Sequence, residues 1–129
     1  MIYLLDTHLL LWSIGDSQKL SRSARECISD PRNRFCFSSA SIWELSIKAL
    51  RRPDTFKIDV EHLRDSLLLL GYQEISIESS HGLATKQLPF LHHDPFDRIL
   101  IAQAIVEGLT LATVDEDILR YSAPTLNLS

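Results

Sequence analysis

A short run of apolar residues that stops abruptly at an acid most constrains how this chain can fold. Ile2 to Leu5 is continuously apolar, and Asp6 and Thr7 follow it directly. Such a run is typical of a strand that is buried on both faces of a sheet. Four more segments are predicted to be strands: 34–38, 74–77, 109–114 and 125–128.

Segments with helix start and stop signals lie between these strands. The clearest is a helix over 96–107, which Asp94-Pro95 opens and Gly108 closes. Further helices are predicted over 8–13, 21–29, 60–70, 78–87 and 116–121, and from just after Ser41 to about Leu50 with Trp43 on its buried side. Strands that alternate with helices predict an α/β fold, in which helices cover both sides of a parallel sheet.

The composition is that of an ordinary globular protein. The 129 residues fit one domain, and the 45% apolar and 23% charged residues exclude disordered, collagen-like and coiled-coil proteins. No apolar stretch approaches the roughly 20 residues that cross a bilayer. The first residues lack the basic region of a signal peptide, so a cytoplasmic protein is expected. Cys27 and Cys36 are expected to be thiols rather than a disulfide.

The charge is unevenly distributed along the chain. A net charge of −4 argues against a nucleic-acid partner. However, the segment from Lys19 to Arg52 holds eight bases against three acids, a local charge of +5. This asymmetry allows a basic surface beside an acidic site, and solvated helix faces are the equally open alternative.

Four acids stand at or near the junctions between strands and helices: Asp6, Glu44, Asp97 and Asp115. Each has an explanation as a helix cap, including a capping box of Glu44 with Ser41, and for each acid alone the cap is the better interpretation. Neighbouring parallel strands nevertheless bring their carboxyl ends together. Carboxylates held a few ångströms apart repel one another unless a cation lies between them. Oxygen-only ligation selects Mg²⁺ or Mn²⁺, which suits phosphodiester hydrolysis.

Four blocks of the sequence resemble the PIN-domain family, and the likeness is strongest to VapC-type toxins of bacterial toxin–antitoxin pairs. The blocks are Leu4-Leu5-Asp6-Thr7-His8, Ser38 to Glu44 with Lys48, His93 to Ala104, and Leu111 to Asp115. Each block is weakly specific by itself. Together they occur in the order of the family and span nearly the whole chain, so the set is specific.

The resemblance implies a PIN-like three-layer α/β/α fold, with a central parallel sheet of about four to five strands in a single domain over residues 1–129. It implies the toxin of a toxin–antitoxin pair, a metal-dependent endoribonuclease that hydrolyses RNA with a metal-activated water. Mg²⁺ or Mn²⁺ is the implied cofactor, and RNA, a cognate antitoxin and a second copy in a homodimer are the partners. Apolar residues over 9–12 and 67–70 fit either a partner surface or core burial.

Site roles follow residue by residue from the resemblance and from charge. The resemblance assigns Asp6, Glu44, Asp97 and Asp115 to the four catalytic, metal-binding positions, and Ser38 and Thr113 to hydroxyl positions that line such sites. Thr7, beside Asp6, is a candidate for orienting the site, with local hydrogen bonding as the alternative. Lys48 and Arg98 are candidates to contact RNA phosphates as positive charges.

Several alternatives remain open. The roles of His92 and His93 are undetermined, because the family often carries Arg at position 93. Asp117 competes with Asp115, which is preferred because it follows the strand directly. A receiver-like or phosphatase-like domain also gathers acids at strand ends, but it needs a later Lys, and none follows Lys86. The main alternative function is a catalytically silent metal-binding module that acts through protein partners.

Overall fold

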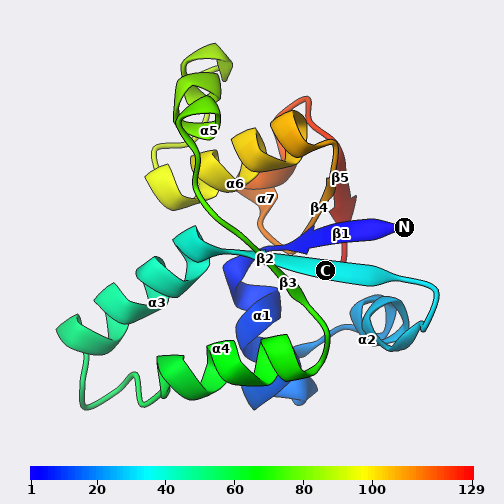
Figure 1. The fold of residues 1–129 in the computed structure, drawn as a ribbon, viewed down its shortest axis with the longest axis vertical. Helices are drawn as coiled ribbons and strands as arrows, with labels where there is room; N and C mark the ends of the chain where they lie inside the picture. Colours follow the sequence, from blue (N-terminus) through cyan, green and yellow to red (C-terminus); the bar gives the residue numbers. More distant parts are fainter.

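Five strands lie side by side in one parallel sheet. The computed structural model describes residues 1–129, and its strands are β1 (Ile2–Leu5), β2 (Arg34–Ser38), β3 (Gln73–Ile75), β4 (Thr110–Thr113) and β5 (Thr125–Asn127). Their spatial order is β3-β2-β1-β4-β5, and every neighbouring pair is parallel. The first strand of the chain therefore forms the centre of the sheet (Figure 1).

Helices lie on both sides of this sheet (Figure 1). They are α1 (Thr7–Gly15), α2 (Arg22–Ser29), α3 (Ser39–Arg51), α4 (Val60–Leu69), α5 (Ser79–Ala84), α6 (Pro95–Glu107) and α7 (Glu116–Leu119), with 3-10 turns η1 (Ser17–Lys19) and η2 (Thr85–Gln87). The five-stranded parallel sheet between two helical layers confirms the predicted α/β/α fold class.

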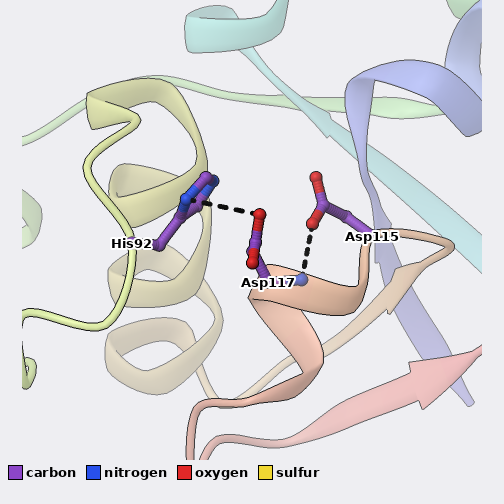
Figure 2. A group of neighbouring side chains, drawn as sticks. All are labelled: His92, Asp115 and Asp117. Atoms are coloured by element: carbon purple, nitrogen blue, oxygen red, sulfur yellow. Dashed lines mark hydrogen bonds and ion pairs between the residues drawn. The ribbon is translucent and has the colours of Figure 1, made fainter.

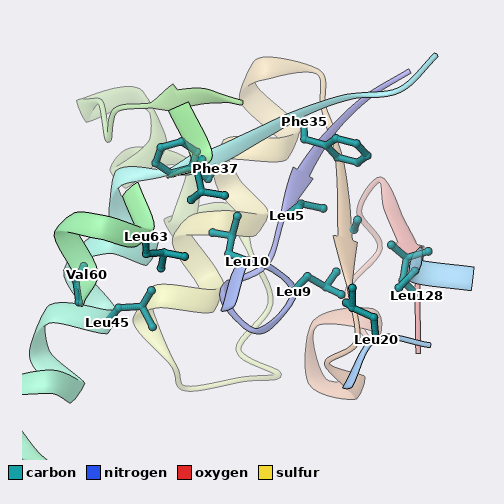
Figure 3. Close-up of a cluster of buried hydrophobic side chains, with 13 residues drawn as sticks. Leu5, Leu9, Leu10, Leu20, Phe35, Phe37, Leu45, Val60, Leu63 and Leu128 are labelled. Atoms are coloured by element: carbon teal, nitrogen blue, oxygen red, sulfur yellow. The ribbon is translucent and has the colours of Figure 1, made fainter. Parts of the chain in front are cut away.

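Adjacent residues of the central strands point into two different cores, one on each face of the sheet. Leu5 belongs to the larger core, with side chains from α1, α3 and α4 (Figure 3), whereas Leu4 packs in the smaller core with Leu100 of α6. In β4, Ala112 belongs to the larger core and Leu111 to the smaller one. Burial of both faces explains why these strands are apolar throughout rather than alternating.

Side-chain caps fix where six of the helices begin. The caps, each of which accepts a backbone N–H, are Asp6 for α1, Ser21 for α2, Ser38 for α3, Asp59 for α4, Asp94 for α6 and Asp115 for α7. Pro95 takes the first position of α6, and Gly108 ends that helix with a φ of 67°, a left-handed conformation that favours glycine. Each such cap contributes about 0.5–2 kcal/mol to stability.

The order of the strands reverses at the centre of the sheet. Strands β2 and β3 extend the sheet on one side of β1, and β4 and β5 extend it on the other. The helices that follow β1 and β4 pack on opposite faces, because α1 contributes to the larger core and α7 to the smaller one. In open parallel sheets, ligands bind at such a reversal, beyond the carboxyl ends of the strands.

Two sequence-based expectations for α3 are wrong. The helix begins at Ser39 and its cap is Ser38, so Ser41 lies inside the first turn and forms no capping box with Glu44. Trp43, predicted on the buried side, is 59% exposed. Its ring contacts Phe96 of α6 edge to face, and this contact covers only part of it. Elsewhere the predicted helix over 78–87 is divided into α5 and η2.

Neither cysteine is in a disulfide, as the sequence predicts. Cys36 lies in the smaller core, and Cys27 packs at the edge of the larger one. Burial raises the pKa of both thiols, so neither is an activated nucleophile. Among the helices, none combines the length and the apolar character needed to cross a bilayer.

Leu45 and Leu50 give a matched test of the core, because both lie on α3 and only Leu45 is buried. Leu45→Ala leaves a cavity, so we expect the free energy of unfolding to fall by roughly 2–5 kcal/mol. Leu50 is 83% exposed, and Leu50→Ala should change it by less than about 0.5 kcal/mol. Urea denaturation followed by circular dichroism measures both variants, and equal losses would contradict this packing.

Candidate metal centre

A small polar pocket lies at the carboxyl ends of β1 and β4. Its volume is about 210 Å³, and no hydrophobic residue lines it. The lining residues are Asp6, Thr7, His8, Glu44, Lys48, His92, Asp94, Asp97 and Asp115. Five of these nine are acids, so we call this site the acid pocket.

Asp6 is the most deeply buried acid of the pocket, with 2% of its surface exposed. Its Oδ1 accepts a hydrogen bond from the backbone N–H of Leu9 at 2.8 Å. Its Oδ2 accepts from the Thr113 hydroxyl at 2.5 Å and from the backbone N–H of Val114 at 3.1 Å. The parallel register of β1 and β4 places these donors beside Asp6. The carboxylate thus links the ends of both strands.

Glu44 enters the pocket from the second turn of α3. The Thr7 hydroxyl donates to its Oε1 at 2.8 Å, and the Thr7 oxygen also lies 2.9 Å from the Ser41 hydroxyl. On the other side, Lys48 Nζ lies 3.4 Å from Glu44 Oε2, one helical turn along. Two neighbours therefore hold Glu44, and Lys48 brings a positive charge to the edge of the pocket.

Asp97 lies in the first turn of α6, behind the cap that Asp94 provides. The side chain of Asp97 is only 15% exposed. Its Oδ2 lies 2.7 Å from Nε2 of His92, which belongs to the loop before the helix. Asp97 therefore faces the pocket with one carboxylate oxygen held by an imidazole.

Asp115 and Asp117 follow β4 and differ in their surroundings. Asp115 caps α7 by accepting the backbone N–H of Asp117 at 2.8 Å. The Asp117 carboxylate turns instead toward His92, with Oδ2 at 3.7 Å from Nδ1 (Figure 2). Asp115 lines the acid pocket and Asp117 does not, so the geometry favours Asp115 for the fourth acidic position.

Burial and crowding of like charges shift the pKa values of these groups. Burial raises the pKa of Asp6, although its hydrogen bonds oppose the shift. Burial, with the charges of neighbouring carboxylates, raises the pKa of Asp97 to about 7 against the effect of His92. Burial alone would lower the pKa of His92, but the hydrogen bond to Asp97 and the charges of Asp97 and Asp117 together raise it.

The residues of the acid pocket fit a hard divalent cation. Burial and neighbouring carboxylates raise the pKa of Asp97 despite the contact with His92, and Lys48 at the edge pairs only with Glu44, so the positive charge in the pocket does not offset the acids. The donor set consists mainly of carboxylate oxygens, which Mg²⁺ and Mn²⁺ prefer. The ligand atoms that lie within 4.8 Å of one another form two smaller groups, which share His92: one with Asp94 and Asp97, one with Asp115 and Asp117. Mg²⁺ keeps several of its waters, so it does not need direct contact with every acid.

The structure brings the four predicted acids together with Thr7 and Lys48. Ser38, predicted to line the site, is fully buried and caps α3 through the backbone N–H of Ala40 at 3.0 Å. Thr113 does not line the pocket itself, but its hydroxyl donates to Asp6. The Ser38 hydroxyl therefore caps a helix and the Thr113 hydroxyl holds a carboxylate, and neither forms part of the pocket surface.

Arg98 lies outside the acid pocket. Its guanidinium donates to the backbone carbonyls of Thr85, Leu88 and Pro89, and to the Tyr121 hydroxyl. These contacts occupy the guanidinium and hold the loop before α6, and Arg98 does not line the acid pocket. Within the protein Arg98 therefore holds this loop, and its contact with RNA phosphates stays a prediction.

Three further residues line the pocket: His8, which beside Asp6 was a candidate for orienting the site, Asp94, which was predicted only as a cap, and His92, which had no assigned role. Asp94 was recognisable as a cap through the Asp-Pro pair. Its carboxylate both caps α6 and lines the acid pocket. His92 reaches the pocket because its loop folds back against Tyr121, whose hydroxyl accepts the His92 backbone N–H at 2.9 Å. No spacing in the sequence signals that fold of the loop.

Comparison with protein families gives one match over most of the chain. The family model of the PIN domain matches residues 3–124. That range contains every residue that lines the acid pocket. No curated protein sequence matches the chain significantly.

Solved structures with a similar fold come from bacterial VapBC complexes. VapBC2 from Rickettsia felis, bound to a DNA fragment from its promoter, has a TM-score of 0.75 and 19% identity over 100% of both chains. DNA-bound VapBC from Salmonella typhimurium has a TM-score of 0.69 and 15% identity over 100% of this chain and 99% of that one. VapBC-1 from nontypeable Haemophilus influenzae has a TM-score of 0.65 and 17% identity over 99% of this chain and 98% of that one. At these identities the likeness concerns the fold.

The raised pKa of Asp97 predicts that the protein in EDTA loses stability as the pH rises. The unfolded chain releases this proton near pH 4, whereas the folded chain keeps it up to about pH 7. The contribution of protonated Asp97 to the free energy of unfolding is therefore complete at low pH and is lost as the pH rises through about 7. Between about pH 6 and pH 8 we expect a loss of about 1.4 kcal/mol, the value of one pKa unit.

Urea denaturation in EDTA at the two pH values measures this loss. Asp97→Asn serves as the control, because the amide does not titrate and should remove the pH dependence. A wild-type protein that is equally stable at both pH values would contradict the raised pKa.

Proposed function

The chain belongs to the PIN-domain family, and on this premise we propose that it is a VapC-type toxin, a metal-dependent endoribonuclease of a toxin–antitoxin pair. The observation that carries the proposal is the acid pocket, in which Asp6, Glu44, Asp97 and Asp115 converge at the reversal of the strand order. Residues 1–129 then act as a single PIN-like domain. The proposed location is the cytoplasm, where the RNA substrate is found.

In this proposal the four acids hold one or two Mg²⁺ or Mn²⁺ ions. The bound cation supplies positive charge for the phosphate and lowers the pKa of water to a value useful at neutral pH. Asp6 offers a carboxylate that Leu9, Thr113 and Val114 already hold in place. Because those hydrogen bonds fix the carboxylate before the substrate arrives, little reorganisation is needed during the reaction.

Glu44 is the residue we assign to accept a proton from the attacking water. The Thr7 hydroxyl holds Oε1 of this carboxylate, and Lys48 lies beside Oε2. General-base action requires such a positioned carboxylate within reach of the proton. Attack in line on a backbone phosphorus leaves a 5′-phosphate and a 3′-hydroxyl, and no side chain becomes the nucleophile.

RNA would reach the acid pocket past Lys48. This lysine lies at the edge of the pocket, with a side chain that is 36% exposed, and can pair with an RNA phosphate. It belongs to the basic segment from Lys19 to Arg52, whose positive charge attracts the RNA backbone. Such attraction weakens as the salt concentration rises.

We assign the antitoxin to a partly apolar groove beside the larger core. The groove, with a volume of about 550 Å³, lies between α1, α4 and the segment before α4. Leu11, Trp12 and Phe56 are among its lining side chains. An amphipathic antitoxin helix can lay its apolar face in a groove of this kind.

A second copy of the chain is the occupant we propose for the exposed apolar face beside the acid pocket. This dimer face is defined by Trp43, Ile77, Phe90 and Phe96, which surround a hollow of about 480 Å³. Trp43 and Phe96 pack edge to face at 5.1 Å between ring centres. Exposed clusters of large apolar side chains mark protein interfaces, and aromatic residues are enriched there.

The alternative is a catalytically silent module that binds a cation and acts only through protein partners. The same acids would then serve structure, since Asp6 and Asp115 cap helices. Glu44 and Asp97 favour the nuclease, because neither caps a helix and both line the pocket.

Replacement of one acid tests the nuclease proposal directly. We expect Asp97→Asn and Asp115→Asn to lower Mg²⁺-dependent RNA cleavage by at least about 100-fold, because each removes charge from the reaction centre. Asp65→Asn on α4 is the matched control, since Asp65 is an exposed acid remote from the pocket. Cleavage of labelled RNA with Mg²⁺ or EDTA gives the readout. Wild-type protein that binds Mg²⁺ but cleaves no RNA would support the silent module.

The dimer face predicts a specific change in oligomeric state. Trp43→Ser removes the largest exposed aromatic ring of this face, so dimerisation should weaken by about 2 kcal/mol or more. Leu50→Ser on the same helix is the control, because Leu50 is exposed outside the face. Sedimentation velocity at micromolar concentration separates monomer from dimer, and a Trp43→Ser protein that dimerises as tightly as wild type would refute the assignment.

A further inference from the structure

His92 lines the acid pocket and contacts two carboxylates, that of Asp97 in the pocket and that of Asp117 beside it. Its Nε2 is 2.7 Å from Oδ2 of Asp97 on α6, and its Nδ1 is 3.7 Å from Oδ2 of Asp117 on α7. Figure 2 shows the imidazole directed across the gap toward Asp117. The ring is mostly enclosed, with 18% of the side chain exposed. One imidazole therefore bridges carboxylates from two helices.

Hydrogen bonds hold the main chain at His92 independently of the acids. The His92 N–H donates to the Tyr121 hydroxyl at 2.9 Å, and Arg98 donates to the same hydroxyl at 3.0 Å. Tyr121 is itself buried in the smaller core. Arg98 also binds the carbonyl of Pro89 at 3.0 Å, so the loop before α6 is held at several points. The main chain at His92 is thus held by contacts with the smaller core, and the ring itself contacts Asp97 and Asp117.

The contact with Asp97 uses only one of its two carboxylate oxygens. Oδ2 faces His92, while Oδ1 has no hydrogen bond within the protein. A carboxylate held by one oxygen in this way keeps its orientation and presents the other oxygen to a ligand. Groups that orient a ligating carboxylate typically strengthen cation binding by about 10–100-fold.

We infer that His92 is a positioning residue, which holds the Asp97 carboxylate in the orientation that binds the cation. This inference rests on the proposed function, because it assumes that Asp97 is a cation ligand. It gives Tyr121 and Arg98 a role as well, since they hold the loop that presents His92. The imidazole acts through Asp97 and makes no contact with the RNA or the reacting atoms.

Cation affinity in the absence of RNA separates this role from a purely structural one. We expect His92→Leu to raise the dissociation constants of both Mg²⁺ and Mn²⁺ by about 10–100-fold. His92→Gln should recover most of the affinity, because the amide can still donate to Asp97. His93→Gln is the matched control: His93 is the next residue, packs against Phe90 and does not line the acid pocket.

Isothermal titration calorimetry with each cation gives the affinities, and circular dichroism checks that every variant is folded. Wild-type affinity in His92→Leu would overturn the inference, as would a His92→Gln protein that binds no better than His92→Leu. A loss confined to Mn²⁺ would also overturn it, because imidazole as a direct ligand favours transition metals over Mg²⁺. Wild-type protein that binds neither cation would refute the proposed function itself, and Asp97→Asn supplies the reference for complete loss of binding.

Discussion

The buried carboxylate of Asp6 is the interaction on which the acid pocket depends. It accepts the Leu9 N–H at the start of α1 and the Thr113 and Val114 donors at the end of β4. A buried carboxylate is costly unless its oxygens are hydrogen-bonded. Its three donors therefore favour one alignment of the central strands, and that alignment sets the distance from Asp6 to the acids of α6 and α7.

Capping and cation binding are compatible roles for the same side chains. Asp6, Asp94 and Asp115 each cap a helix and line the acid pocket. A cap accepts N–H groups at the helix start, where the partial positive charge of the backbone also favours a carboxylate. The remaining lone pairs of each carboxylate are available to a ligand. The structural and functional interpretations of these acids therefore do not compete.

The sequence was most informative where local pattern and burial coincide. The bounds of β1 and β2 were predicted correctly, because a strand buried on both faces gives a continuous apolar run. The sequence pattern did not predict burial or position where contacts with residues distant in the sequence determine them. The apolar side of α3 gave no sign that its partners leave Trp43 exposed. The positions of His92 and Arg98 depend on a loop that folds back on Tyr121, and this contact spans 29 residues of sequence.

The pairing of β1 with β4 determines when the centre can form. Asp6 and Thr113 are separated by 107 residues, so a ribosome must make most of the chain before the two meet. At about 5–20 residues per second this takes on the order of ten seconds. Until then the nascent polypeptide lacks two of the three donors that hold Asp6, those of Thr113 and Val114. A chain with the proposed activity therefore lacks an assembled acid pocket during most of its synthesis, and the pocket can form only after β4 has been made.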